Sequence, residues 1–182
     1  MKYCTTCCSV SRKSNSIIFS VACLLLFSNR AAYAQTSSYE ELQAAYIYNF
    51  AKYVKWPTEG NPTFVIGIYG ELEIMEFLQK TLDGKKIKGE VIELREINSV
   101  EEMMDVSIVY VPESGSKNMN ALIDAVRGKS ILIVTEDDLI KKGAMISFVV
   151  EDDKLRFKLK KNALAEAGLV ASEGLLKLAI QL

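Results

Sequence analysis

Two acidic tripeptides are the first candidates for a chemical site. Glu136 to Asp138 and Glu151 to Asp153 each place three carboxylates in a row, and carboxylate oxygens bind calcium or act as acids and bases. Neither tripeptide has the alternating carboxylates and the glycine of a calcium-binding loop. A carboxylate pair for glycoside hydrolysis stays open, although nothing selects two of the 23 acidic residues. We interpret the first tripeptide as a helix start and the second as a hairpin turn.

A glycine-containing segment, Gly67 to Gly70, is the second candidate. It ends an apolar run of strand length, and backbone N–H groups at such a junction can bind phosphate. The segment lacks the third glycine of a dinucleotide-binding loop and the Gly-Lys-Ser/Thr of a nucleotide-binding P-loop. We interpret its glycines as turn residues. Any small ligand is expected in the loops at the carboxyl ends of the strands.

Histidine is absent from the sequence, and all four cysteines, Cys4, Cys7, Cys8 and Cys23, lie within the first 34 residues. The chain that follows therefore lacks the usual ligands of zinc, copper and haem. It also lacks the base of a Ser-His or Cys-His pair. We predict no metal, no cofactor and no catalytic residue, and an enzyme with a carboxylate-based site remains a minor alternative.

Residues 1–34 have the pattern of a secretory signal peptide, with early basic residues, the apolar run "SIIFSVACLLLF" and the small-residue site Ala32-Tyr33-Ala34. We predict cleavage after Ala34 and a periplasmic location. The run is shorter than the roughly 20 residues of a membrane span, which disfavours a retained anchor. Acylation at Cys23 is a weaker alternative, because the apolar residues continue beyond it.

The remaining chain, residues 35–182, is one domain's length of sequence. Removal of the first segment takes four basic residues and no acidic ones, which leaves 18 basic and 23 acidic residues and a net charge of −5. A mildly acidic surface argues against nucleic acid or anionic lipid as the partner.

Predicted strands and helices alternate along this domain. A first helix begins at a capping box, Ser38 to Glu41, and ends at Pro57. Further helices are expected over 72–82, from 99, over 116–128 and on either side of Gly168; strands are expected over 63–69, 90–97, 106–111, 130–135, 145–150 and 154–159. The pattern predicts a single-domain, Rossmann-like α/β fold, whose mostly parallel sheet is flanked by helices and has an antiparallel C-terminal hairpin at its edge.

Four residues of the first helix and its end are candidates for partner binding. The predicted buried stripe is Leu42, Ala45, Tyr46, Asn49, Phe50 and Tyr53. Asn49 would then need a hydrogen-bonding partner, in the core, at a dimer contact or in a ligand. Tyr48, Lys52 and Lys55 are expected on the outward side, where they could meet an acidic partner or be simply solvated.

Three segments together resemble the YfiR family of periplasmic proteins: "AAYIYNFAKYVKWP", "GAMISFVVEDDKLRFKL" and "AGLVASEGLLKLA". The resemblance spans nearly the whole mature chain. Its most recognisable part is the aromatic helix that leads into Trp56-Pro57.

The resemblance implies a compact and often dimeric domain that binds the periplasmic part of an inner-membrane diguanylate cyclase and holds it inactive. Cyclic di-GMP and biofilm formation would then fall. Relatives also accompany sensor kinases, and in the best-known system an outer-membrane lipoprotein sequesters the repressor. The alternative is a periplasmic small-molecule-binding module that acts with a sensor kinase or a transporter.

The sequence departs from the family pattern at three places. The mature chain has no cysteine, so redox control through disulfides is unsupported. Gly143-Ala144 stands where many relatives have two glycines, and Lys160 stands where an asparagine is common. A change in specificity is expected if either position contacts a partner.

Overall fold

The computed structural model describes residues 30–57, 63–70 and 73–182, with 30–38 described by their backbone only. Residues 1–29, which hold all four cysteines and most of the predicted signal peptide, lie outside the described residues. The signal peptide and its cleavage after Ala34 therefore stay predictions. No helix in the described ranges has the length and apolar character needed to cross a bilayer.

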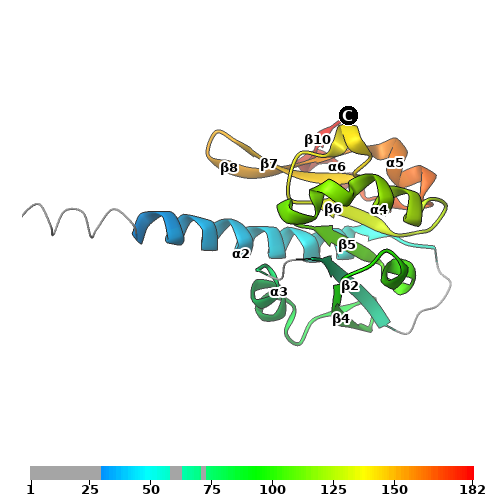
Figure 1. Cartoon of the computed structure of the whole chain (residues 1–182), viewed down its shortest axis with the longest axis horizontal. Helices are drawn as coiled ribbons and strands as arrows, with labels where there is room; N and C mark the ends of the chain where they lie inside the picture. The colour runs from blue at the N-terminus through cyan, green and yellow to red at the C-terminus, as the bar shows by residue number, and fades with distance from the viewer. Residues whose placement is uncertain (1–29, 58–62, 71–72) are drawn as a thin grey trace, which may run out of the picture. The chain divides into compact units, whose positions relative to one another are not determined.

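One mixed sheet organises residues 39–182 (Figure 1). Its central strands, all parallel, are β4 (Glu90–Ile97), β2 (Thr63–Tyr69), β5 (Ile108–Val111), β6 (Leu132–Thr135) and β7 (Ile146–Glu151), in that spatial order. β8 (Lys154–Leu159) pairs antiparallel with β7, and β3 (Lys86–Ile87) pairs antiparallel with β4. The first long strand, β2, thus lies between the second and the third, as in doubly wound sheets of the flavodoxin type.

Helices cover both faces of this sheet. One face packs against α2 (Arg30–Tyr53), α3 (Met75–Leu82), α5 (Lys161–Glu166) and α6 (Glu173–Leu178). The other face packs against α4 (Met119–Val126) and the 3₁₀ helix η1 (Glu101–Asp105). Two further 3₁₀ helices are η2 (Glu113–Asn118) and η3 (Ile140–Lys142). Neighbouring strand residues such as Ile108 and Val109 belong to opposite faces, as the pleat of a strand requires.

The predicted fold class is confirmed, with two differences at the margins. The hairpin β7–β8 does not form the sheet edge, because β10 (Ile180–Gln181) pairs parallel with β8. β1 (Val54–Lys55) and β9 (Val170–Ala171) form a separate two-stranded sheet. Strands of two residues are too short to show an alternating pattern, so the sequence did not predict them.

The predicted ends of the first helix are wrong. α2 runs through Ser38 without a break, so the capping box does not start it. Ala31, Ala32 and Ala34 precede the box, and alanine has the highest helix propensity. At the other end α2 stops at Tyr53, because Val54 and Lys55 extend to pair with β9 before Pro57 is reached.

The buried face of α2 also differs from the predicted stripe. Ala44, Ile47, Phe50 and Val54 are fully buried, whereas Leu42 is 45% exposed and Tyr53 43% exposed. The prediction gave weight to large apolar and aromatic side chains. Small residues such as Ala44 instead allow the helix backbone to lie close to the sheet.

An aromatic cluster fixes α2 to the hairpin. The Phe50 ring meets the Phe157 ring edge-on at 4.9 Å between centroids and lies 5.9 Å from that of Phe148. The Tyr46 ring lies 5.4 Å from Phe157, and its hydroxyl donates to the Leu155 carbonyl at 3.5 Å. Such ring pairs add about 0.5–1.5 kcal/mol each beyond their burial.

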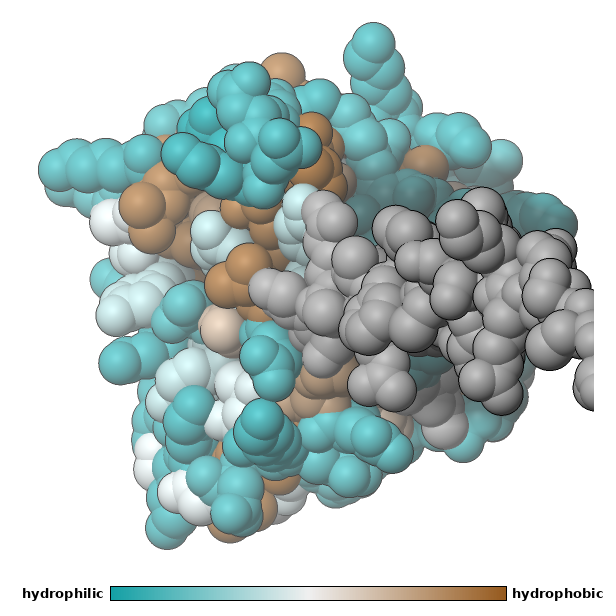
Figure 2. All heavy atoms as spheres, turned by 90° about the vertical axis from the view of Figure 1, so that its left-hand side faces the viewer, coloured by the Kyte–Doolittle hydropathy of each residue, from teal (hydrophilic) through white to brown (hydrophobic). Residues whose placement is uncertain are grey.

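On the side drawn in Figure 2, hydrophobic residues run down the middle and hydrophilic ones border them.

The hairpin turn is formed as predicted. Asp152 and Asp153 have φ angles of 51° and 56°, the left-handed values required at both central residues of a type I′ turn. Aspartate tolerates this conformation better than most residues. The second acidic tripeptide is therefore a turn.

Gly143, at the end of η3, should resist substitution for two reasons. Its φ of 107° disfavours any residue with a Cβ, and an added Cβ would lie 3.1 Å from Cδ1 of Ile123. We expect Gly143→Ala to lower the free energy of unfolding by about 2–3 kcal/mol. The control, Gly84→Ala, has a φ of 66° and open space around its Cβ, and should cost about 1 kcal/mol. Equal losses in urea unfolding would contradict this account.

Candidate functional site

A crevice opens at the carboxyl ends of the parallel strands, where β2 and β5 lie side by side. Their connections leave in opposite directions, since β2 leads to β4 and β5 leads to β6. Open α/β sheets bind ligands at such a point. The hollow measures about 510 Å³, and it is lined by Glu40, Gln43, Glu73, Ile74, Tyr110, Pro112, Glu113, Ser114, Ser116, Lys117, Glu136 and Asp137. We call it the switch-point crevice.

Carboxylates dominate this crevice. α2 contributes Glu40, the segment before α3 contributes Glu73, η2 contributes Glu113, and the loop after β6 contributes Glu136 and Asp137. Lys117 is the one basic residue of the described lining. The crevice therefore suits a cationic or neutral ligand better than a phosphate or a nucleotide.

Burial raises the pKa of Glu136 above its usual value, and the nearby Asp137 and Glu113 carboxylates raise it further. Hydrogen bonds from the Glu113 backbone and the Gln43 side chain act in the opposite direction. The pKa of Glu40 is also raised, first by burial and then by Glu73 and Glu136. Each of these carboxyl groups is thus easier to protonate here than in water.

Gln43 is a buried polar residue of α2. Gln43 is 5% exposed, and its Oε1 accepts a hydrogen bond of 3.1 Å from the hydroxyl of Tyr110 on β5. The prediction placed this role on Asn49, which is only half-buried. Burial also raises the pKa of Tyr110 strongly, so its hydroxyl keeps its proton and stays a donor.

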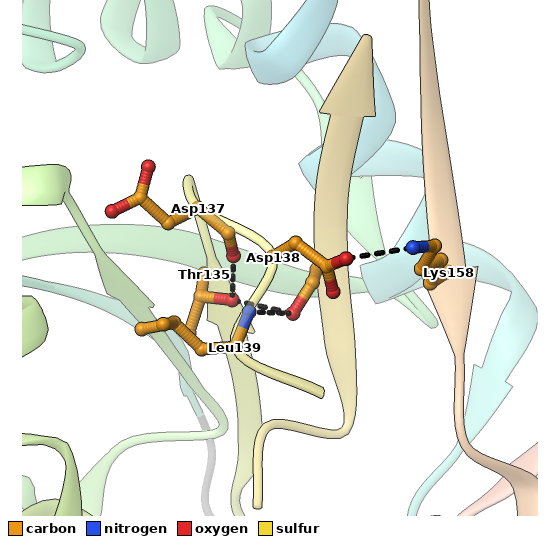
Figure 3. A network of polar contacts seen from close by, with 6 residues as sticks. Thr135, Asp137, Asp138, Leu139 and Lys158 are labelled. Atoms are coloured by element: carbon orange, nitrogen blue, oxygen red, sulfur yellow. Dashed lines mark hydrogen bonds and ion pairs between the residues drawn. The ribbon is translucent and has the colours of Figure 1, made fainter. Parts of the chain in front are cut away.

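Side-chain hydrogen bonds hold the loop after β6 in place (Figure 3). The Thr135 hydroxyl lies 2.7 Å from both the Asp137 carbonyl and the Ser147 hydroxyl, and Ser147 Oγ accepts from the Leu139 N–H at 3.1 Å. Asp138 pairs with Lys158 on β8 at 2.6 Å. The predicted helix start is wrong, because no side chain caps η3 and the first acidic tripeptide forms this loop. The loop instead carries Glu136 to the crevice.

The glycine segment after β2 does not offer a free donor at Gly70. The Gly70 N–H donates to the Ile97 carbonyl at 3.1 Å, and its φ of 89° makes it a turn residue. The interpretation as a turn residue is confirmed for Gly70. It is wrong for Gly67, which lies within β2 and pairs with Arg95 of β4 and Val109 of β5. No group of three or more metal-ligating side chains is found in the described residues.

A family model described as YfiR/HmsC-like matches residues 40–180. The chain belongs to this family. No curated protein matches the sequence. Membership supports, in general terms, a regulator of a diguanylate cyclase rather than an enzyme. The matched range contains the sheet, apart from Gln181 at the end of β10, and every residue of the described crevice lining.

Three of the four predicted partner-binding residues, Tyr48, Asn49 and Lys52, lie on α2, and Lys55 lies on β1. Their role in partner binding stays a prediction. Tyr48 is partly buried, and the Lys85 ammonium lies 4.5 Å from the centre of its ring. Both lysines are exposed at the carboxyl end of α2: Lys52 lies in its last turn and Lys55 on β1. Sequence reasoning expected a ligand at the strand ends and named the Glu136 tripeptide as a candidate, but it did not connect the two. Glu40, Gln43, Tyr110 and Glu136 meet only in the folded chain.

The hydrogen bond between Gln43 and Tyr110 should be measurable by a double-mutant cycle. Gln43→Leu or Tyr110→Phe alone leaves a buried polar atom unpaired and should cost about 1–3 kcal/mol of unfolding free energy. The double variant should be more stable than the sum of the two losses predicts, by about 1 kcal/mol. Strict additivity in chemical denaturation would show that the two side chains do not interact.

Proposed function

We propose that the protein is a periplasmic repressor that binds the periplasmic domain of an inner-membrane diguanylate cyclase and holds it in a less active state. Cyclic di-GMP and biofilm formation would fall as a result. The observation that carries this proposal is the family match over residues 40–180. It covers the chain from the buried half of α2 to β10.

Repression of this kind depends on a difference in affinity. A protein that binds both states of a cyclase equally shifts nothing, however tightly it binds. A tenfold bias toward the inactive state needs about 1.4 kcal/mol of additional binding free energy for that state. A modest surface can supply this amount, and no catalytic group is required.

The surface that best fits such a partner lies where α2 meets the β1–β9 sheet. Lys55 and Val170 are opposite each other in this antiparallel pair, so their side chains share a face. Val170 is 59% exposed, Tyr53 is partly exposed, and the Lys52 ammonium lies 5.4 Å from the centre of the Tyr53 ring. We call Lys52, Tyr53, Lys55 and Val170 the basic end patch.

The chemistry of this patch combines an apolar centre with cations at its margin. Partner surfaces often pair an apolar core with a polar rim, and opposite charges at the rim raise the rate of association. An acidic surface with an apolar centre would fit it. Tyr48 and Asn49 remain predictions for the same role.

A cross-linked pull-down from the native envelope tests this proposal. The bait is the tagged protein as wild type, as Lys52→Glu with Lys55→Glu, and as Lys141→Glu with Lys142→Glu. The last pair is also exposed, lies on η3 and gives the same change in net charge. We expect wild type and control to enrich an inner-membrane diguanylate cyclase, and the first double variant to lose roughly tenfold or more of it.

Two outcomes would contradict the proposal. Enrichment of a sensor kinase without any cyclase would move the output to another pathway. If the wild-type bait enriches no inner-membrane protein, a role as a regulator of a membrane enzyme is contradicted. Equal capture by both double variants would instead exclude the basic end patch as the contact surface.

A small-molecule-binding role is the second candidate, favoured by the volume of the switch-point crevice. Ligand binding to the folded state raises the midpoint of thermal unfolding. A screen of cationic, aromatic and nucleotide metabolites by thermal shift separates the two roles. A homodimer and an outer-membrane lipoprotein as a further partner stay predictions from the family resemblance.

A further inference from the structure

The switch-point crevice brings together carboxylates from segments that are distant in sequence. Glu40 lies on α2, Glu136 follows β6, and both line the same hollow. The carboxylate of Glu136 also accepts a hydrogen bond of 2.9 Å from the Glu113 N–H. Contacts around Glu136 therefore join the loops after β5 and β6 to each other, while Gln43 joins α2 to β5.

Titratable groups face Glu136 from every segment around the crevice. The charged ones are Glu40 of α2, Glu73 before α3, Glu113 and Lys117 of η2, and Asp137, the next residue in the chain. The hydroxyl of Tyr110 on β5 is neutral. Negative groups outnumber the single cation of the described lining. Like charges across a hollow repel, and the repulsion is stronger where water is partly excluded.

We infer that the switch-point crevice is an acid-responsive latch, which holds the first buried turns of α2 against the loops after β5 and β6 when protons neutralise its carboxylates. When these carboxylates are charged, repulsion loosens the contact and residues 39–47 open more often. This inference concerns the protein alone and does not depend on any partner.

The direction of the pH effect follows from linkage. The pKa values of Glu40 and Glu136 are raised in the closed crevice, so the closed state binds protons more tightly than an opened, solvated state. The added stability of the closed state is fully present below the ordinary value of 4.5. It is lost as the pH rises through the raised values.

Hydrogen–deuterium exchange of the purified protein at pH 4 and pH 7.5 tests the latch. After correction for the intrinsic effect of pH, we expect amides of residues 39–47 to exchange more slowly at pH 4. Each unit of raised pKa gives up to about a tenfold difference. Amides of α4, on the opposite face of the sheet, should show no such difference.

Substitutions assign the effect to the crevice. Glu40→Gln with Glu136→Gln should remove the pH dependence and give slow exchange at both values. Glu96→Gln with Glu166→Gln, which changes two exposed carboxylates elsewhere, should keep the wild-type response. If the first double variant does not fold, Glu40→Gln alone should reduce the response.

Two results would overturn the inference. One is equal corrected exchange of residues 39–47 at the two pH values in the wild-type protein. The other is a pH response that survives in a folded variant lacking both Glu40 and Glu136. Neither result bears on the proposed binding of a cyclase, because no partner takes part in the measurement.

Discussion

The packing of α2 across the sheet is the constraint on which the rest of the structure depends. Phe50 and its aromatic neighbours fix the helix to the β7–β8 hairpin, and Ala44 and Ile47 bury its face. Gln43 meets Tyr110 near the carboxyl end of β5, whereas the Trp56 indole N–H donates to the Ser107 carbonyl just before that strand begins. The buried part of the helix therefore runs antiparallel to β5, from the carboxyl ends of the strands toward their amino ends.

This orientation produces two surfaces with opposite charge. The beginning of the buried helix brings Glu40 to the switch-point crevice, and its end brings Lys52 to the basic end patch. The apolar contacts of α2 offset the repulsion that its position imposes on the carboxylates. Charge repulsion that persists in a stable fold is typical of sites under functional constraint.

Much of the fold could be predicted because its signals are local. The runs that become β2, β5 and β6 are continuous and apolar, as strands covered on both faces are. The turn at Asp152-Asp153 and the cap at Ser172, whose hydroxyl accepts from the Leu175 N–H at 3.3 Å, also follow from residue type. These features need no knowledge of distant contacts.

The candidate site could not be predicted because it is made by distant contacts. The sequence predicts Asn49 rather than Gln43 as the buried polar residue, because the sequence alone does not show which face of α2 meets Tyr110. β1 and β9 are two-residue strands whose segments are distant in sequence, and the Ser172 N–H donates to the Tyr53 carbonyl beside them. The order of the strands determines where the crevice lies, and this order cannot be predicted from any single segment of the sequence.

The domain belongs to a family of regulators and has a charged crevice at the carboxyl ends of its parallel strands and a basic, partly apolar patch toward the other end of α2. The central proposal is that this domain lowers cyclic di-GMP synthesis. The most direct test is to quantify cyclic di-GMP by mass spectrometry in cells with the coding sequence deleted and in cells complemented with it. The account predicts a rise on deletion and a return to the original level on complementation, and an unchanged level in both strains would contradict it.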